Sequence, residues 1–121
     1  MSIASIRGAT TVNHNTKTEI LEATKEVLEA IIFHNNLTLE QIVQINFSAT
    51  KDLDAIYPAI AARDMGITNA SLMCFQEMYV EGSLAQCIRI SMLVDADTLD
   101  RQSLKHQYLQ KAKCLRPDLS E

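Results

Sequence analysis

The 121-residue chain has no tryptophan, only three glycines and two prolines, and 5% aromatic residues. It contains none of the motifs GxGxxG, GxxxxGK and GxSxG, which excludes the common phosphate loops and the serine-hydrolase elbow. The cysteines, Cys74, Cys87 and Cys114, form no CxxC pair and each has apolar neighbours. We therefore expect buried thiols in a reducing cytoplasm, and no disulfide framework.

Charge and hydrophobicity exclude further classes of protein. The net charge is −4 and no basic run occurs, so nucleic acid is not an expected partner. No apolar stretch approaches the roughly 20 residues of a membrane span, and no signal-peptide pattern is visible, so no membrane association is expected. The histidines His14, His34 and His106 lack metal-ligand spacing, and no metal site is predicted.

Length and composition predict one globular domain over residues 1–121. Apolar residues make up 47% and charged residues 21% of the chain, as in ordinary globular proteins. A chain of this size suits a single domain and buries roughly two-thirds of its unfolded surface.

Alternating polarity, together with one short apolar run, predicts four strands. In the last of them, Arg89, Ser91 and Leu93 share one face, and the other face is apolar and consists of Ile88, Ile90, Met92 and Val94. The four predicted strands are Ile3 to Ala9, Gln44 to Ser48, Leu72 to Phe75, and Cys87 to Val94.

Capping signals predict the helices. Thr16 followed by Glu19 is a capping box, and apolar residues then recur at helical spacing until about Asn35. Pro58 suits the first turn of a short helix, and Gly66 suits its end. The stripe of the long helix consists of Ile20, Thr24, Val27, Leu28 and Ile31.

The rest of the chain is less regular. Asp95 to Ser103 is predicted to be a loop, and Leu104 to Leu115 fits a helix and a strand equally well. Taken together, the elements predict an α+β fold with one sheet of about five strands and helices on one face. Oligomerisation is the natural way to cover the other face.

Several arginines lie on predicted rigid elements. Arg89 sits in mid-strand, where an unpaired guanidinium is costly to bury, and Glu77 across the turn is its candidate partner. The alternative is a solvent-facing arginine with an exposed glutamate. For Arg7, Arg63 and Arg116, solvated surface charges are the corresponding alternatives. Because arginine holds a carboxylate through two parallel hydrogen bonds, the group predicts an anion site but no reaction.

Short motifs follow one another along nearly the whole chain. They are Ile6 to Val12 (IRGATTV), Ser48 to Leu53 (SATKDL), Tyr57 to Ala59 (YPA), Ala62-Arg63, Cys74 to Met78 (CFQEM), Cys87 to Arg89 (CIR), Tyr108-Leu109, and Leu115 to Leu119 (LRPDL). In these motifs the chain resembles the monofunctional, trimeric chorismate mutases of the Bacillus type.

The resemblance implies a mixed five-stranded sheet with one long helix and short helical turns, and a barrel-like homotrimer with active sites at subunit interfaces. It implies the rearrangement of chorismate to prephenate, the shikimate-pathway branch point toward phenylalanine and tyrosine, with no cofactor and no metal. The reaction is intramolecular: a C–O bond breaks as a C–C bond forms. No proton is transferred, so no acid–base constellation is expected.

The resemblance also implies catalytic and binding roles. Arg89 would stabilise the negative charge that develops on the ether oxygen. Glu77 and Cys74 would contact the ring hydroxyl, with Glu77 as an anchoring acceptor and not a general base. Arg7 and Tyr108 would hold the side-chain carboxylate, and Arg7 would also orient Glu77.

Other residues are implied to line or close the site. Tyr57, Ala59 and Arg63 would come from the neighbouring subunit. Leu115 and Arg116 would come from a C-terminal tail that covers the site.

The chain also departs from the family pattern. Tyr57 adds a hydroxyl where an aromatic such as Phe is expected, Ile60 replaces a familiar lysine, and Met73 replaces a smaller polar residue. The match is poor from Asp95 to Gln107. The alternative function is a non-catalytic trimeric module that binds a carboxylate metabolite. A weaker one is a deaminase-type enzyme of the trimeric reactive-imine family, which the grouping of Cys74 with Glu77 and Arg89 argues against.

Overall fold

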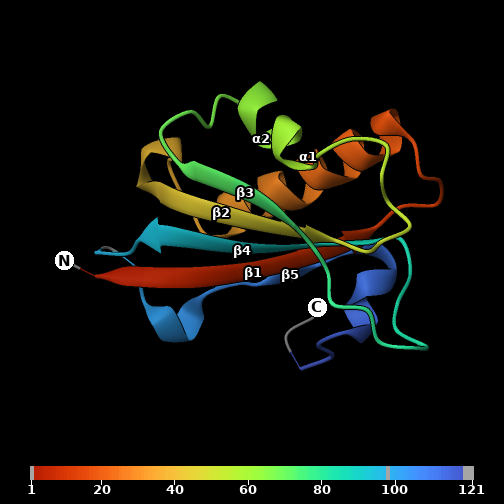
Figure 1. The fold of residues 1–121 in the computed structure, drawn as a ribbon. Helices are drawn as coiled ribbons and strands as arrows, with labels where there is room; N and C mark the ends of the chain where they lie inside the picture. Colours follow the sequence, from red (N-terminus) through yellow and green to blue (C-terminus); the bar gives the residue numbers. More distant parts are fainter. Residues whose placement is uncertain (1, 98, 119–121) are drawn as a thin grey trace.

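The computed structural model describes residues 2–97 and 99–118, so Leu119 of the last motif lies outside the described part. One mixed sheet of five strands, in the order β3-β2-β4-β1-β5, forms its centre (Figure 1). The α+β prediction is confirmed. β4 runs antiparallel to both β1 and β2, while β3 is parallel to β2 and β5 is parallel to β1. The strands are β1 (Ile3–Thr11), β2 (Ile42–Ala49), β3 (Ser71–Gln76), β4 (Cys87–Asp95) and β5 (Gln107–Tyr108).

Two helices, α1 (Lys17–His34) and α2 (Ala59–Asp64), lie on the same side of the sheet (Figure 1). All five residues of the predicted apolar stripe of α1 are buried. α2 follows Pro58 and stops before Gly66, whose φ of +88° is a left-handed conformation that glycine adopts without strain. None of the helices in the described residues is long and apolar enough to cross a membrane.

The central strand β4 shows the predicted alternation. Ile88, Ile90 and Met92 are buried on the face that carries the helices. Arg89 points to the opposite face, which we call the open face of the sheet. Its neighbours across the ladder are Ala9 on β1 and Ser48 on β2, so Arg89 lies in the middle of the sheet and not at its edge.

Gly8 allows α1 to lie directly against β1. A Cβ at this position would lie 2.8 Å from Ile31 Cδ1 and 3.0 Å from Val27 Cγ2. Both distances are shorter than van der Waals contact, so a larger residue would push the helix away from the strand. The adjacent residue Arg7 projects from the other side of this closely packed strand.

The segment that fitted both helix and strand contains a little of each. β5 covers two residues, and the 3-10 helix η3 (Gln110–Cys114) follows it. The break falls at Gln110, whose φ of +51° is incompatible with either regular element. The predicted loop before it also contains a 3-10 helix, η2 (Arg101–Ser103), and a third, η1 (Leu39–Gln41), precedes β2.

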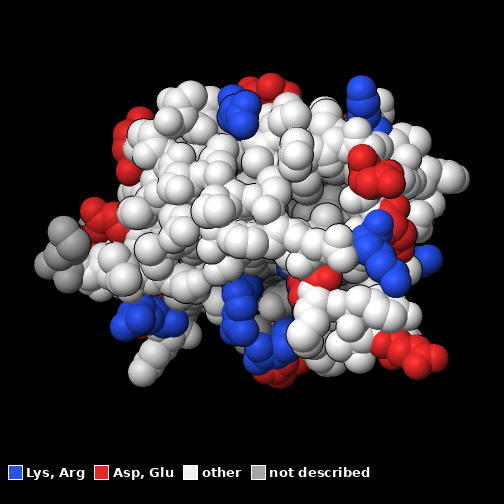
Figure 2. Space-filling view, in the orientation of Figure 1, with Lys and Arg blue, Asp and Glu red and all other residues white. Residues whose placement is uncertain are grey.

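The open face is only partly covered. The C-terminal segment packs there through Tyr108 and Ala112, which cluster with Ala9 and Cys87. Figure 2 shows a hollow in this view with basic and acidic side chains at its rim. Further along the face, Met73 and Phe75 of β3 remain 51% and 49% exposed in the single chain.

One cysteine prediction is wrong. Cys87 is buried and Cys74 is half-buried, but Cys114 is exposed at the end of η3. Its apolar sequence neighbours did not predict burial because a 3-10 turn of this length hides only Ala112.

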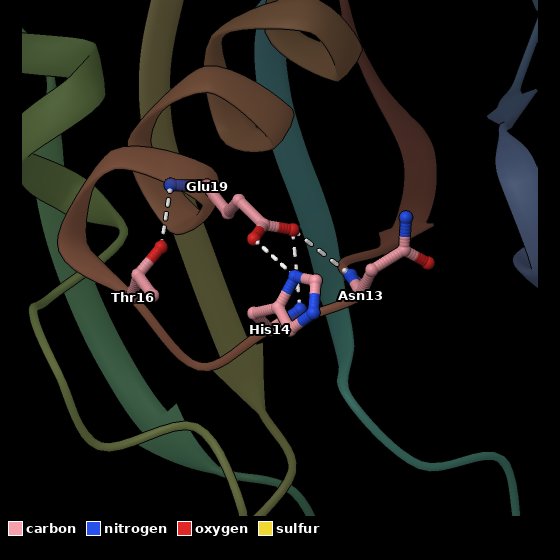
Figure 3. A network of polar contacts seen from close by, with 4 residues as sticks. All are labelled: Asn13, His14, Thr16 and Glu19. Atoms are coloured by element: carbon pink, nitrogen blue, oxygen red, sulfur yellow. Dashed lines mark hydrogen bonds and ion pairs between the residues drawn. The ribbon is translucent and has the colours of Figure 1, made fainter.

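The start of α1 is held by half of the predicted capping box (Figure 3). Thr16 Oγ1 accepts a hydrogen bond from Glu19 N at 3.2 Å, as predicted. The return bond is absent because Thr16 N–H already donates to the carbonyl of His14. The Glu19 carboxylate instead accepts from the backbone amides of Asn13 and His14, both at 3.1 Å, and lies 2.7 Å from His14 Nδ1.

These contacts change the acidity of Glu19. Desolvation raises the pKa of its carboxyl, but the hydrogen bonds from the side chain and backbone of His14 and from Asn13 outweigh it, and the net pKa is lowered. A carboxyl whose pKa is lower in the folded state stabilises the fold above its unfolded pKa. That contribution is lost as the pH falls through the folded pKa.

We expect Thr16→Ala to lower the free energy of unfolding by about 1 kcal/mol, because the amide of Glu19 loses its acceptor. Urea denaturation at a fixed chain concentration measures this change. Thr18→Ala is the matched control, because Thr18 is exposed within the first turn of the same helix and caps nothing. Equal destabilisation by the two substitutions would contradict the capping role.

Candidate active site

The centre of the candidate site is the pair formed by Arg89 of β4 and Glu77, the residue after β3. Arg89 Nε lies 3.3 Å from Glu77 Oε2, so the predicted pairing across the turn is confirmed. Ser48 of β2 donates a 2.5 Å hydrogen bond to the same carboxylate oxygen, and Glu77 N–H donates to Ala49 O at 2.9 Å. The carboxylate is therefore fixed from both its backbone and its side chain.

The Arg89 guanidinium has a hydrogen-bond donor that the described residues do not use. Its Nε atom is buried, and within the described residues it makes no aligned hydrogen bond despite its proximity to Glu77. The side chain as a whole remains 41% exposed. A buried donor without an acceptor is uncommon in folded proteins, and such a donor can bind an anion or a polarised oxygen of a ligand.

A cavity of about 380 Å³ on the open face brings five predicted site residues together. It is walled by β1, β2 and β4, and its end is closed by β5 and the segment after η3. The predicted residues that line it are Arg7, Arg89, Tyr108, Leu115 and Arg116. We call these residues, together with Glu77, the arginine half of the site.

The tail residue Arg116 is directed by Asp118. Its Nε and Nη2 donate to the two carboxylate oxygens of Asp118 at 3.0 and 2.8 Å. This hydrogen-bonded pairing lowers the pKa of the Asp118 carboxyl. Arg116 thus lines the cavity with its planar group already oriented by Asp118.

Tyr57 and Cys74 line a second cavity, of about 660 Å³, at the β3 edge of the sheet. Cys74 pairs with Phe47 in the β2–β3 ladder, and Phe47 belongs to the buried face that carries the helices. Cys74 therefore points to the opposite side of the sheet from Arg89. The two cavities share Phe47, Ser48 and Phe75 in their walls.

Ala59 and Arg63 lie on α2, next to this second cavity in sequence, but they are not among its lining residues. Ala59 is buried in the first turn of α2, while its neighbours Pro58 and Ile60 line the cavity wall. Arg63 is exposed in the last turn of α2. We call Tyr57, Ala59, Arg63 and Cys74 the helix half of the site.

The structure places one predicted contact differently. Arg7 lines the cavity beside Arg89, but in the described part of the chain Glu77 lies within ion-pair distance of Arg89 and not of Arg7. Glu77 is oriented instead by Ser48, a residue to which the sequence assigned no role. The available signal for Ser48 was strand alternation, which places the polar side chains of Asn46 and Ser48 on the same face of β2.

A second residue that the sequence did not single out is His106. Its Nδ1 accepts a 2.9 Å hydrogen bond from the backbone N–H of Arg7. Burial lowers the pKa of the His106 ring, and the positive charges of Arg7 and Arg116 lower it further. Spacing rules look for metal ligands, so they give no signal for a histidine that binds a main-chain amide.

The Cys87 thiol lies beneath the arginine half of the site. Burial raises its pKa, and the nearby Arg89 guanidinium opposes that effect only in part. Cys87 is therefore a neutral packing residue under Tyr108 and not a nucleophile. Within residues 2–97 and 99–118, no three His, Cys, Asp or Glu side chains are grouped so that they could hold a metal ion.

The arginine half has the chemistry of a site for a small organic dianion. Three arginines and Tyr108 line one cavity, and Glu77, paired with Arg89, supplies one acceptor. Guanidinium groups bind carboxylates with two parallel hydrogen bonds, and a carboxylate such as Glu77 accepts from a hydroxyl. The cavity therefore suits a ligand with carboxylates and one hydroxyl group.

Comparison with known proteins agrees with this chemistry. A family model described as chorismate mutase type I matches residues 3–119. The chain is 47% identical to chorismate mutase AroH of Bacillus subtilis (strain 168) over 99% of this chain and 94% of the relative. It is 37% identical to chorismate mutase AroH of Thermus thermophilus over 97% and 96%. The solved chorismate mutase of Clostridium thermocellum matches with a TM-score of 0.88 and 49% identity, over 91% of this chain and 97% of that one.

Proposed function

The chain belongs to the type I chorismate mutase family, and we propose that the arginine half of its site holds chorismate with Arg89 at the ether oxygen. The protein is an isomerase that converts chorismate to prephenate. The alternative of a non-catalytic module is not retained, because relatives named chorismate mutase match nearly the whole chain. What we propose concerns the residues, the assembly and the cellular location.

Arg89 carries the electrostatic part of the mechanism. As the C–O bond breaks, negative charge grows on the ether oxygen, and a fixed cation stabilises that charge more than it stabilises the ground state. The observation that supports this role is the buried Nε of Arg89, which the Glu77 carboxylate approaches without satisfying its hydrogen-bonding capacity. No reorganisation is needed when the charge appears, because β4 holds the side chain at the centre of the sheet.

The other residues of the arginine half restrict the substrate. Arg7 and Tyr108 hold the side-chain carboxylate, and Glu77 accepts a hydrogen bond from the ring hydroxyl. Leu115 and Arg116 close the cavity from the tail. Holding the enolpyruvyl arm over the ring converts a rare conformer into the bound one, which lowers the barrier without any proton transfer.

The helix half serves a neighbouring subunit in a homotrimer. Cys74 points away from Arg89 within one chain, and Tyr57 is 71% exposed, so neither completes the site of its own chain. The exposed Met73 and Phe75 supply apolar surface for the contact between subunits. In this assembly Tyr57, Ala59, Arg63 and Cys74 face the arginine half of the next chain.

We place the enzyme in the cytoplasm. Cys74, Cys87 and Cys114 are all free, and one of them is exposed, which is typical of proteins in a reducing compartment.

A stable dicarboxylate analogue of the transition state tests the site and the assembly together. Calorimetry with light scattering should find one analogue per chain and a particle of three chains. Arg7→Ala should weaken binding about tenfold or more, because a charge-assisted contact to a carboxylate is lost. A monomer with one analogue bound at full affinity would refute the shared site.

A further inference from the structure

The contact between β5 and β1 is short and ends at His106. Two residue pairs form the parallel ladder, Gly8 with Gln107 and Ala9 with Tyr108. On the Tyr108 side, Leu109 N–H donates to Ala9 O at 2.9 Å. On the other side, Arg7 N–H donates to His106 Nδ1 at 2.9 Å, so the imidazole takes the place of a main-chain acceptor.

We propose that His106 is a positioning residue, which fixes Arg7 and Tyr108 relative to each other through Nδ1 and makes substrate binding sensitive to pH. The inference rests on the roles proposed above for Arg7 and Tyr108. Both residues line the same cavity and come from strands that meet only at this short ladder. The imidazole of His106 therefore accepts the last hydrogen bond of the ladder, the one donated by the backbone amide of Arg7.

The segment before β5 is anchored elsewhere, so it does not replace this bond. Asn35 Oδ1 accepts from Lys105 N at 2.9 Å, and Asn35 Nδ2 donates to Lys105 O at 3.0 Å. Asn35 is buried at the end of α1. These bonds tie residue 105 to the helix, but the tie between this segment and β1 at Arg7 is the His106 ring.

The hydrogen bond requires a lone pair on Nδ1, so the ring must be neutral with its proton on Nε2. The charged groups that face the ring are Arg7 on β1 and Arg116 after η3, the latter bound to Asp118, and both disfavour protonation. A histidine whose pKa is lower in the fold than in the unfolded chain stabilises the fold above the unfolded pKa of about 6.5. As the pH falls below that value this stabilisation is lost, and on protonation the ring can no longer accept from Arg7.

Two substitutions at position 106 distinguish the effect of the hydrogen-bond acceptor from the effect of protonating the ring. In His106→Asn, the amide oxygen lies near the position of Nδ1 and accepts without titrating. In His106→Leu, the acceptor is lost at every pH, and the amide of Arg7 is left unpaired. We expect His106→Leu to lower kcat/KM about tenfold at pH 7.5, mainly through KM, and His106→Asn to stay close to the wild-type value.

The measurement is kcat/KM for chorismate between pH 5 and 8 for the whole enzyme and both variants. The wild type should lose kcat/KM on the acid side below the ordinary histidine pKa, and His106→Asn should lack that acid limb. The proposal fails if His106→Asn keeps the limb or if a folded His106→Leu keeps the wild-type kcat/KM. If His106→Leu does not fold, the His106→Asn profile still decides the question.

Two further measurements distinguish failure of this proposal from failure of the proposed substrate contacts. Ring ¹⁵N shifts of His106 should report an Nε2–H tautomer, and a doubly protonated ring at pH 7.5 would overturn the inference regardless of activity. Arg7→Ala should raise KM. If it does not, the carboxylate role of Arg7 is wrong, and the ring shifts still test the hydrogen bond itself.

Discussion

Arg89→Ala is expected to lower kcat by about a thousandfold or more, because the cation that meets the developing charge on the ether oxygen is removed. A factor of this size corresponds to about 4 kcal/mol of transition-state stabilisation. The cost to the fold is smaller. The Arg89–Glu77 pair is 41% and 27% exposed at its two side chains, and ion pairs with that exposure contribute at most about 1 kcal/mol. Steady-state kinetics with chorismate, alongside urea unfolding, separates the two quantities.

The pattern of the kinetic change is as informative as its size. A contact made only in the transition state lowers kcat and kcat/KM together, whereas a ground-state contact raises KM. We therefore expect Arg89→Ala to act on kcat and Arg89→Lys to be intermediate, since lysine keeps the charge but loses the planar fork. Arg101→Ala is the matched control, because Arg101 is exposed on η2, outside both cavities. A folded Arg89→Ala enzyme with nearly wild-type kcat would rule out the mechanism.

Mixing two inactive variants is expected to restore activity. Arg89→Ala disables the arginine half, and Tyr57→Glu places a negative charge in the helix half, opposite a dianionic substrate. Repulsion between the new carboxylate and the substrate carboxylates within one site should lower kcat/KM about a hundredfold. Tyr57 is 71% exposed in the chain, so its replacement should not disturb folding. In trimers reassembled from equal amounts of both chains, about a quarter of the sites pair two intact halves.

The expected restoration is therefore to about a quarter of wild-type activity, measured after joint refolding from urea. The control mixture contains Arg7→Ala and Arg89→Ala. Both residues line the same cavity of one chain, so no mixed site is intact and activity should not exceed the average of the two variants assayed separately. Restoration in the control mixture, or none in the test mixture, would show that the halves are not shared between subunits.

The sequence predicted β4 and its consequences well. Strict alternation from Cys87 to Val94 assigns each side chain to a face, and that assignment alone places Arg89 opposite the core. The capping signal likewise located the start of α1, where Thr16 is the N-cap residue as predicted. In each case the signal is local, because the residues that define the element lie within it.

Signals that depend on tertiary contacts were missed. Leu72 to Phe75 is apolar throughout, so it has no alternation that could show Cys74 facing away from Arg89. The register with β2 decides that orientation. The C-terminal segment was ambiguous for a related reason, since β5 exists only because β1 offers a free edge beside Gly8 and Ala9. His106 is informative only once that pairing is known.

The missing side chain at Gly8 also limits which parts of the site are able to move. At Gly8, the residue after Arg7, the side chains of Ile31 and Val27 and the Gln107 carbonyl pack close against the strand. The backbone under this guanidinium is therefore nearly stationary, and we expect adjustments to an incoming ligand to occur in the segment bearing Leu115 and Arg116. Opening and closing of the pocket should accordingly resemble a flap moving over a fixed floor, and not a cleft whose two walls both shift.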